Sequence, residues 1–374
     1  MEGVDTGTFA DRFGPVVCQC EEFGVHCCMR LSSFTWTLVF AVLIVRLTTI
    51  YFEIFQGAGP PTLDVDMWLE GNTPRPFGTR VLVPWVVLGA SRVVPEATRQ
   101  RIEAGTLRLP IRALPARVEY QVLGVLVILC FAGYTVVMRK LVRSVFEAGG
   151  LQFNLITGCS LLLMPVMFRY HNYFYDPATL VLSTLLWYLM YRERWTMFLP
   201  VFILACFNKE TALLFLVSAA LWWNHRAGVR PGLPHLAILL SAGLLVRIGI
   251  AVLSSHLPGS LLEFHLFDHN LSRLFMFFEP IDLVSTLFIG FLVFSYWKEK
   301  PALLTIGTIH LAILVAAAVF SAYVDEYRQY FDCYPILVLT MAYSLMKLGG
   351  GPIVPAPACG SPLRDAGPGV CFRT

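Results

Sequence analysis

The sequence is poor in charge, and lysine is the scarcest of its charged residues. Only 14% of its 374 residues are charged, against about 25% in soluble domains. This shortage excludes an ordinary soluble domain, and the 56% hydrophobic content predicts an all-α, polytopic membrane protein. Five lysines stand against 23 arginines, and the net charge is only +3, with no basic run that would indicate nucleic acid. The arginine bias favours a bacterial plasma membrane over the endoplasmic reticulum.

Cysteine patterns and repeats are also missing. The ten cysteines have the spacing of neither a disulfide framework nor a standard zinc site, even in "CQCEEFGVHCC" near the start. No internal repeat is visible. We expect residues 1–28 to be a disordered N-terminal extension and the Gly/Pro-rich residues 349–374 to be a disordered tail. Residues 29–348 are then the integral membrane domain.

Long apolar runs predict a transmembrane helical bundle of about eight full spans, because a spanning helix needs about 20 mostly apolar residues. The predicted spans are 33–55, 118–138, 151–168, 178–191, 235–253, 281–297, 302–320 and 332–347. The run 81–91 is too short to cross and contains a proline. We expect it to be an interfacial helix within a long first outer loop, 56–117.

One apolar segment, residues 197–223, is interrupted by Asn208, Lys209 and Glu210. A charge at the bilayer centre costs about 2.5–3.5 kcal/mol, so this "NKE" must face protein or water. The basic short loops place both termini in the cytoplasm, which requires this segment to enter and return. We therefore predict a re-entrant hairpin of two short helices with "NKE" at its tip. The alternative is one broken crossing, which would invert every later loop.

Two carboxylates stand out in the first outer loop. Asp64 and Asp66 lie two residues apart in "LDVDMW". In an extended segment this spacing points both side chains the same way. The pair could bind a divalent cation, or one member could act as a general base. The structural alternative is a solvated loop with turn-forming acids.

Four cations and one histidine are candidates for binding phosphate. They occur in "RVLVP", "RYHNYFYDP", "NKE" and "DEYRQYFDCYP", and they are Arg80, Arg169, His171, Lys209 and Arg328. Arginine's planar fork matches phosphate oxygens. Each also has a structural interpretation, as a snorkelling side chain or an interfacial anchor. Asp176, which precedes a proline, has the pattern of a helix N-cap.

The order of these motifs resembles the polytopic bacterial members of the GT-C glycosyltransferase superfamily. A span is followed by an outer loop with Asp-x-Asp, then "RVLVP", "YDP", "NKETALL" and "DEYRQYFDCYPILV" before the last span. The resemblance covers about residues 33–347 and rests on a pattern of motifs. In many members the hairpin motif reads Arg-Glu-Thr. Lys209 keeps the positive charge of that arginine but loses its planar fork.

The resemblance implies an inverting transfer of a sugar from a polyprenyl-phosphate donor to a glycan, lipid or protein acceptor at the outer face of the membrane. Asp66 or Asp64 would be the base, with Asp66 favoured because Met67 and Trp68 could anchor it at the membrane edge. The cations would hold the phosphate, and Glu210 would orient Lys209. Membrane lipid is an expected partner, and no cofactor is implied beyond a divalent cation at the Asp pair.

Two other functions fit the same composition. A transporter or flippase of a lipid-linked or anionic substrate also keeps charged groups in broken helices near a cavity. A non-catalytic membrane protein of the same fold is the third interpretation. The long outer loop and the lack of repeats favour the enzyme, whereas a coupled ion flux would favour transport.

Overall fold

The computed structural model describes residues 33–54, 65–146, 150–168, 172–260, 264–271, 280–323 and 326–350. These residues form helices joined by short connections, and no strand occurs among them. The chain divides into two compact units, Met1–Leu43 and Ile44–Thr374, and every element discussed below belongs to the second unless stated. The predicted extension and most of the predicted tail lie outside the described residues.

Five described helices are long and apolar enough to cross a membrane, which supports an integral membrane protein. They are the helix Ser33–Ile54, which begins in the first unit, and α5 (Val118–Val145), α6 (Gly150–Met167), α10 (Val229–Leu253) and α13 (Ala302–Ser321). All five coincide with predicted spans.

The other three predicted spans are shorter helices. They are α7 (Asp176–Tyr191), α12 (Pro280–Phe294) and α14 (Tyr334–Leu348), of 16, 15 and 15 residues. At a rise of about 1.5 Å per residue they reach about 24 Å at most, less than the roughly 30 Å of a hydrocarbon core. Their crossing of a membrane therefore stays a prediction, and so does the total of eight spans.

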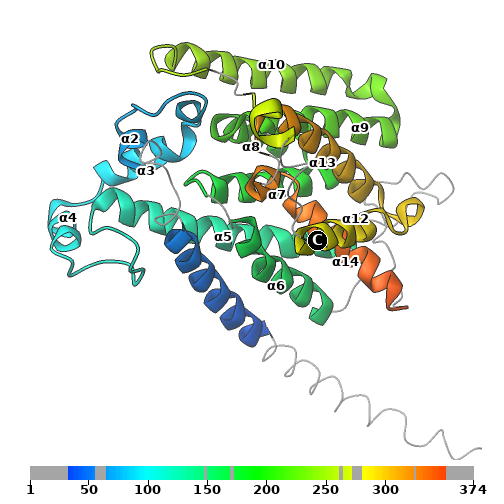
Figure 1. The fold of residues 1–374 in the computed structure, drawn as a ribbon, viewed down its shortest axis with the longest axis horizontal. Coiled ribbons are helices and arrows are strands. Elements are labelled where there is room, and N and C mark those ends of the chain that lie inside the picture. Colours follow the sequence, from blue (N-terminus) through cyan, green and yellow to red (C-terminus); the bar gives the residue numbers. More distant parts are fainter. Residues whose placement is uncertain are drawn as a thin grey trace, which may run out of the picture. The chain divides into compact units, whose positions relative to one another are not determined.

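The most buried helix is α7, which packs between α5 and α8 (Trp195–Asn208). In turn, α10 covers both α8 and α9 (Phe215–Ala227), as Figure 1 shows. Helix α13 packs against α9 and α14. It meets α14 closely at Gly307, where a Cβ atom would lie 2.2 Å from Cγ2 of Ile336. Glycine at this position therefore permits the contact between the two backbones.

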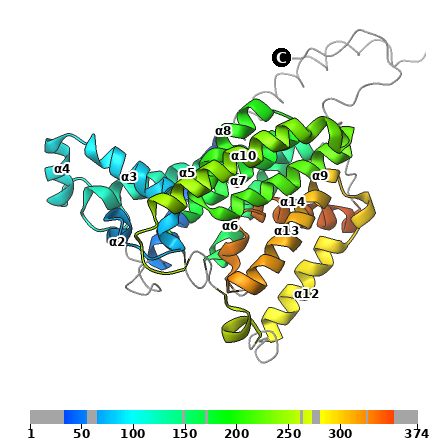
Figure 2. The same ribbon diagram turned by 90° about the horizontal axis from the view of Figure 1, so that it is seen from above.

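Between the first long helix and α5 the chain forms a group of short helices. They are α2 (Val65–Leu69), η3 (Phe77–Thr79), α3 (Leu82–Arg92) and α4 (Glu96–Glu103). Helix α3 coincides with the predicted helix 81–91, and Pro84 is tolerated because it lies in the first turn. Figures 1 and 2 place α4 at the end of the unit away from α12. Further short helical turns, namely η4 (Glu210–Leu214), η5 (Leu266–Asn270), η6 (Trp297–Glu299) and η7 (Tyr327–Tyr330), lie later in the chain.

The apolar segment around "NKE" forms two helices with a break between them. Helix α8 ends at Asn208, Lys209 has an extended backbone (φ −156°, ψ 143°), and η4 begins at the next residue. The indole of Trp195, at the start of α8, stacks on that of Trp223, near the end of α9, with ring centroids 5.1 Å apart. The chain therefore turns back on itself at this break. The placement of the turn inside a membrane stays a prediction.

Candidate functional site

The start of α3 lies beside the end of α8, because the Val81 N–H donates to the carbonyl of Phe207 at 3.2 Å. This contact brings Arg80 to the turn that contains "NKE". The Arg80 guanidinium is buried and binds the Glu210 carboxylate through two hydrogen bonds, at 2.6 Å and 3.2 Å. Its carbon also lies 4.5 Å from the centre of the Tyr175 ring. Two predicted site residues, Arg80 and Glu210, are thus in direct contact.

Glu210 has partners that the sequence does not predict. Its carboxylate is bound by Arg80 and lies 3.9 Å from a second guanidinium, that of Arg247. It also interacts electrostatically with Lys209, and its role in orienting that lysine stays a prediction. Arg247 comes from α10 and also donates to the carbonyl of Cys206 and the hydroxyl of Thr79. The carboxylate prefers these guanidinium groups because α3 and α10 both pack against the turn.

Lys209 is almost completely buried, with 2% of its surface exposed. An ammonium group has three hydrogen-bond donors. Among the described residues its only hydrogen bond is a long one, 3.5 Å, to the carbonyl of Gln329. The nearby carboxylate of Asp332 is instead hydrogen-bonded to the hydroxyl of Thr211 at 2.5 Å. Lys209 is therefore a buried cation with unused donors.

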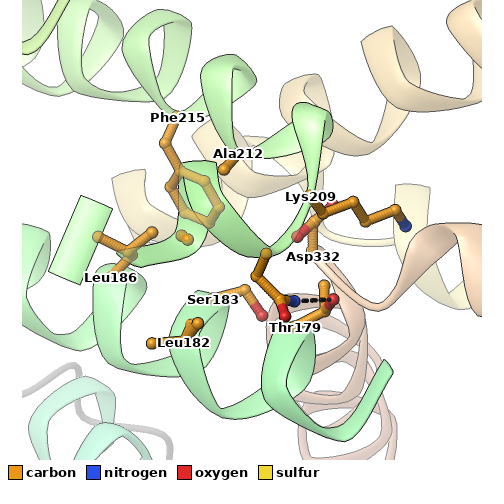
Figure 3. Close-up of a pocket in the computed structure, with 10 residues that line it drawn as sticks. Thr179, Leu182, Ser183, Leu186, Lys209, Ala212, Phe215 and Asp332 are labelled. Atoms are coloured by element: carbon orange, nitrogen blue, oxygen red, sulfur yellow. Dashed lines mark hydrogen bonds between the residues drawn. The ribbon is translucent and has the colours of Figure 1, made fainter. Parts of the chain in front are cut away.

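A small cavity of about 10 Å³, roughly the space of one water molecule, lies beside Lys209. Figure 3 shows its polar side, with Lys209, Asp332, Thr179 and Ser183, and its apolar side, with Leu182, Leu186, Ala212 and Phe215. The Lys209 side chain extends away from the apolar side. The Asn208 amide holds the end of α8 against α7 by donating to the hydroxyl of Thr179 at 2.8 Å.

Arg328, in η7, is the third of the predicted cations found at the site. Its guanidinium binds Glu326 at 2.5 Å and lies over the ring of Tyr173, 3.9 Å from the centroid. The Tyr173 and Tyr175 rings are stacked, 5.3 Å apart and 8° from parallel. Arg328 thus lies over Tyr173 and Arg80 over Tyr175, two cation–π contacts that help to position both guanidinium groups.

The three cations converge on a carboxylate for which the sequence predicted only capping. Asp176 is fully buried as the first residue of α7, and its Oδ2 accepts the N–H of Tyr173 at 2.8 Å. The N-cap of α7 is Tyr175 and it makes no side-chain cap bond, so the predicted N-cap role of Asp176 is wrong. Its Oδ1 has no hydrogen-bond partner among the described residues. Arg328, Lys209 and Arg80 all interact with it electrostatically. The cations come from distant parts of the sequence, so their convergence on Asp176 could not be predicted from local sequence patterns.

The described part of this cluster is balanced in charge. It contains four cations and four carboxylates, namely Arg80, Lys209, Arg247 and Arg328 with Asp176, Glu210, Glu326 and Asp332. Lys209 interacts electrostatically with the carboxylates of Asp332, Asp176 and Glu210. Opposite charges therefore help to hold the cluster together.

Asp66 is placed differently from the prediction. It lies in the short helix α2, not in an extended segment, because Val65 and Trp68 pack inward at helical spacing. Its two carboxylate oxygens accept from Arg117 Nη1 at 2.7 Å each. The link to the site is indirect, because Trp68 packs against Tyr175, which in turn contacts Arg80. Asp66 is therefore paired with Arg117, and the aromatic rings of Trp68 and Tyr175 lie between its helix and Arg80.

Several predicted site residues remain untested. Asp64, Arg169 and His171 lie outside the described residues. Within the described part of the chain, no group of three or more His, Cys, Asp or Glu side chains is arranged to hold a metal ion. The divalent cation at the Asp64–Asp66 pair stays a prediction.

Comparison with known proteins finds no matching family, no matching curated protein and no matching solved structure. The functional argument therefore rests on the geometry of the cluster.

Proposed function

We propose that the chain is an integral membrane glycosyltransferase of the GT-C type, which moves a sugar from a polyprenyl-phosphate donor to an acceptor with inversion. The observation that carries the proposal is Lys209, whose buried ammonium group has unused donors beside Arg328 and Arg80. A buried cation with unsatisfied donors is costly unless a ligand supplies the missing acceptors. A phosphate oxygen is such an acceptor, and charge-assisted bonds to it are strong.

The residues take distinct roles in this proposal. Lys209 donates to the phosphate of the donor and stabilises its charge as the sugar leaves. Arg328, fixed by Glu326 and Tyr173, adds to the positive field. The base stays in the first outer loop, as Asp66 or Asp64, and takes the proton of the acceptor hydroxyl. In this reaction the acceptor oxygen forms the new bond to the anomeric carbon, and the polyprenyl phosphate leaves with the electron pair of the broken bond.

A topology accompanies the proposal. With eight spans and both termini in the cytoplasm, the turn at Lys209 is the tip of a re-entrant hairpin at the outer side of the membrane. Its support is the contact between Val81, at the start of α3, and Phe207, at the end of α8. If α3 lies at the interface, the cluster lies at the same depth, where a lipid-borne phosphate is found.

The test measures binding of a short-chain polyprenyl phosphate without sugar to purified protein. Lys209→Met should weaken binding by about 10–100-fold, since a hydrogen bond to a charged group contributes about 1.5–3 kcal/mol. Lys209→Arg should retain part of the binding. The control is Lys298→Met, which removes an exposed lysine without a described ion pair. Unchanged binding by folded Lys209→Met protein would remove the phosphate role. Single-turnover transfer from polyprenyl-phosphate sugars then tests the reaction itself.

One observation favours transport as a second candidate. The helix is broken at Lys209 by a single extended residue, and discontinuous helices with charged breaks are typical of transporter binding sites. Proteoliposomes separate the two functions. Movement of a lipid phosphate between leaflets without sugar transfer would support the transporter, whereas transfer of a sugar supports the enzyme.

A further inference from the structure

The segment from the last residue of α3 to the start of α5 is strongly basic. Residues 92–117 contain six arginines and two glutamates, a net charge of +4, which exceeds the +3 of the whole protein. The remainder of the chain is therefore close to neutral, and the positive charge is concentrated between α3 and α5. We call this stretch the arginine segment.

Within the described part of the chain, two of these arginines form ion pairs and four do not. Arg99 lies near Glu96 and Glu119, and Arg117 binds Asp66. The unpaired arginines are exposed and form no ion pair with any described residue, and they are Arg92, Arg101, Arg108 and Arg112. Four solvated guanidinium groups in one short stretch create a local positive potential, which attracts an anionic partner.

Apolar side chains lie exposed beside these arginines. The inner face of α3 packs on α5, through buried Val83 and Val87. Trp85 packs one side of its ring near Phe207 of α8, 5.9 Å between centroids, and leaves 50% of its surface exposed. Val93, directly after Arg92, is 80% exposed. Exposed Trp and Val next to a run of arginines are typical of a helix in the membrane interface, with apolar groups at the acyl boundary and cations at the head groups.

We propose that the outer face of α3 and the arginine segment form a binding surface for anionic phospholipid head groups. Charge complementarity accounts for the four unpaired arginines, and contact with acyl chains accounts for Trp85 and Val93. A soluble polyanion would use the arginines only and would leave the apolar side chains in water. The proposal is independent of sugar transfer. It implies that the protein gathers anionic lipid around α3, at the end of α8 where the charged cluster lies.

The test uses full-length protein reconstituted in neutral lipid with a minor fraction of anionic phospholipid. Bromine is placed on the acyl chains of either the anionic or the neutral lipid, and quenching of tryptophan fluorescence is measured. The contribution of Trp85, one of eight tryptophans, is obtained by subtracting the signal of Trp85→Phe. At equal mole fraction, the anionic lipid should be enriched at Trp85 at least about fivefold, since one arginine near an anionic surface contributes about 1 kcal/mol.

Two charge variants complete the design. Replacing the four unpaired arginines by Gln should make the two brominated lipids equally effective. The matched control replaces four exposed cations from other parts of the chain by Gln, namely Arg192, Arg194, Arg230 and Lys298, and should leave the preference unchanged. Equal quenching by both lipids in the unmodified protein would overturn the anionic preference. Quenching of Trp85 by neither lipid would show that this face contacts something other than lipid, such as a protein partner, and would overturn the whole proposal.

Discussion

Two buried lysines of this protein differ in how their ammonium groups are satisfied. Lys300 is 7% exposed, and its Nζ donates to three carbonyls at the end of α12, at 3.3, 2.7 and 2.5 Å. Lys209 is 2% exposed, and its Nζ reaches a single carbonyl at 3.5 Å. Lys300 therefore caps a helix and has no donor to spare, because carbonyls at a helix C-terminus need such partners.

The contrast separates a structural charge from a candidate ligand-binding charge by geometry alone. Both lysines adjoin apolar helices, and they are two of only five lysines in the chain. The distinguishing quantity is the number of donors that the protein itself satisfies. On this criterion Arg328 lies between the two lysines, because Glu326 and the Tyr173 ring engage it but its Nε has no hydrogen-bond partner among the described residues. The predictions below test the criterion on each of these groups.

The largest expected effect is at Arg328. Glu326→Gln removes its carboxylate partner and leaves the guanidinium buried, at 3% exposure of the side chain. We expect the free energy of unfolding in mixed micelles to fall by about 3–5 kcal/mol, as for a broken buried pair. The control is Glu193→Gln, whose partner Arg226 is less buried, and it should cost about 1 kcal/mol or less. Similar losses for both variants would show that Glu326 is not the essential counter-charge.

The second effect is the direct comparison of the lysines. Lys300→Met leaves the last carbonyls of α12 without their donor, and should reduce the free energy of unfolding by about 2–3 kcal/mol. Lys209→Met removes a buried charge that the protein satisfies poorly, and should change it by about 1 kcal/mol or less. Denaturant unfolding of both variants measures the difference. A larger loss for Lys209→Met would mean that Lys209 has a structural role, and would weaken the phosphate proposal.

The sequence predicts the helices well and the partners of the charged residues poorly. The break at Lys209 and the helix at 82–92 follow from a charged group in an apolar run and from an apolar run too short to cross. Hydrophobic periodicity carries this information because it is local. The pairing of Arg80 with Glu210 joins residues 130 positions apart and depends on how α3 packs against α8. No local pattern indicates such a contact.

Asp176 illustrates the same limit. "YDP" predicts that Asp176 is the N-cap of α7, but the N-cap is Tyr175, which makes no side-chain cap bond, and Asp176 is the first residue of the helix. Its carboxylate instead accepts the N–H of Tyr173, which precedes the helix. The three cations around the same carboxylate could not be predicted, because they belong to segments near residues 80, 209 and 328. The motif "YFYDP" does contain information about the cations, because Tyr173 and Tyr175 lie just before Asp176. Their stacked rings support Arg80 and Arg328.

A smaller effect is expected from acid. Burial raises the pKa of Glu210, but Arg80 and then Arg247 lower it further, to about 2. The ion pair therefore adds stability above the ordinary carboxyl pKa of about 4.3, and this stability is lost as the pH falls toward 2. The Glu210 side chain is 39% exposed, so solvent screening limits the effect to on the order of 1 kcal/mol. Unfolding measured across this pH range should show a flatter dependence for Glu210→Gln. Parallel curves for the two proteins would contradict the pairing with Arg80.

The smallest effect on stability is expected at Asp66, and it also tests the role of the first outer loop. The pair with Arg117 is largely exposed, at 34% and 51% of the two side chains, so Asp66→Asn should cost about 0–1 kcal/mol. Arg117→Gln should cost about the same, and the double variant should cost no more than their sum. If Asp66 is the base, however, Asp66→Asn should lower single-turnover transfer by about 10²–10⁴-fold while Arg117→Gln keeps the carboxylate and most of the rate. Equal and small losses of rate in the two variants would leave Asp66 as a surface ion-pair partner only, and would move the search for the base to Asp64 or to the buried Asp332.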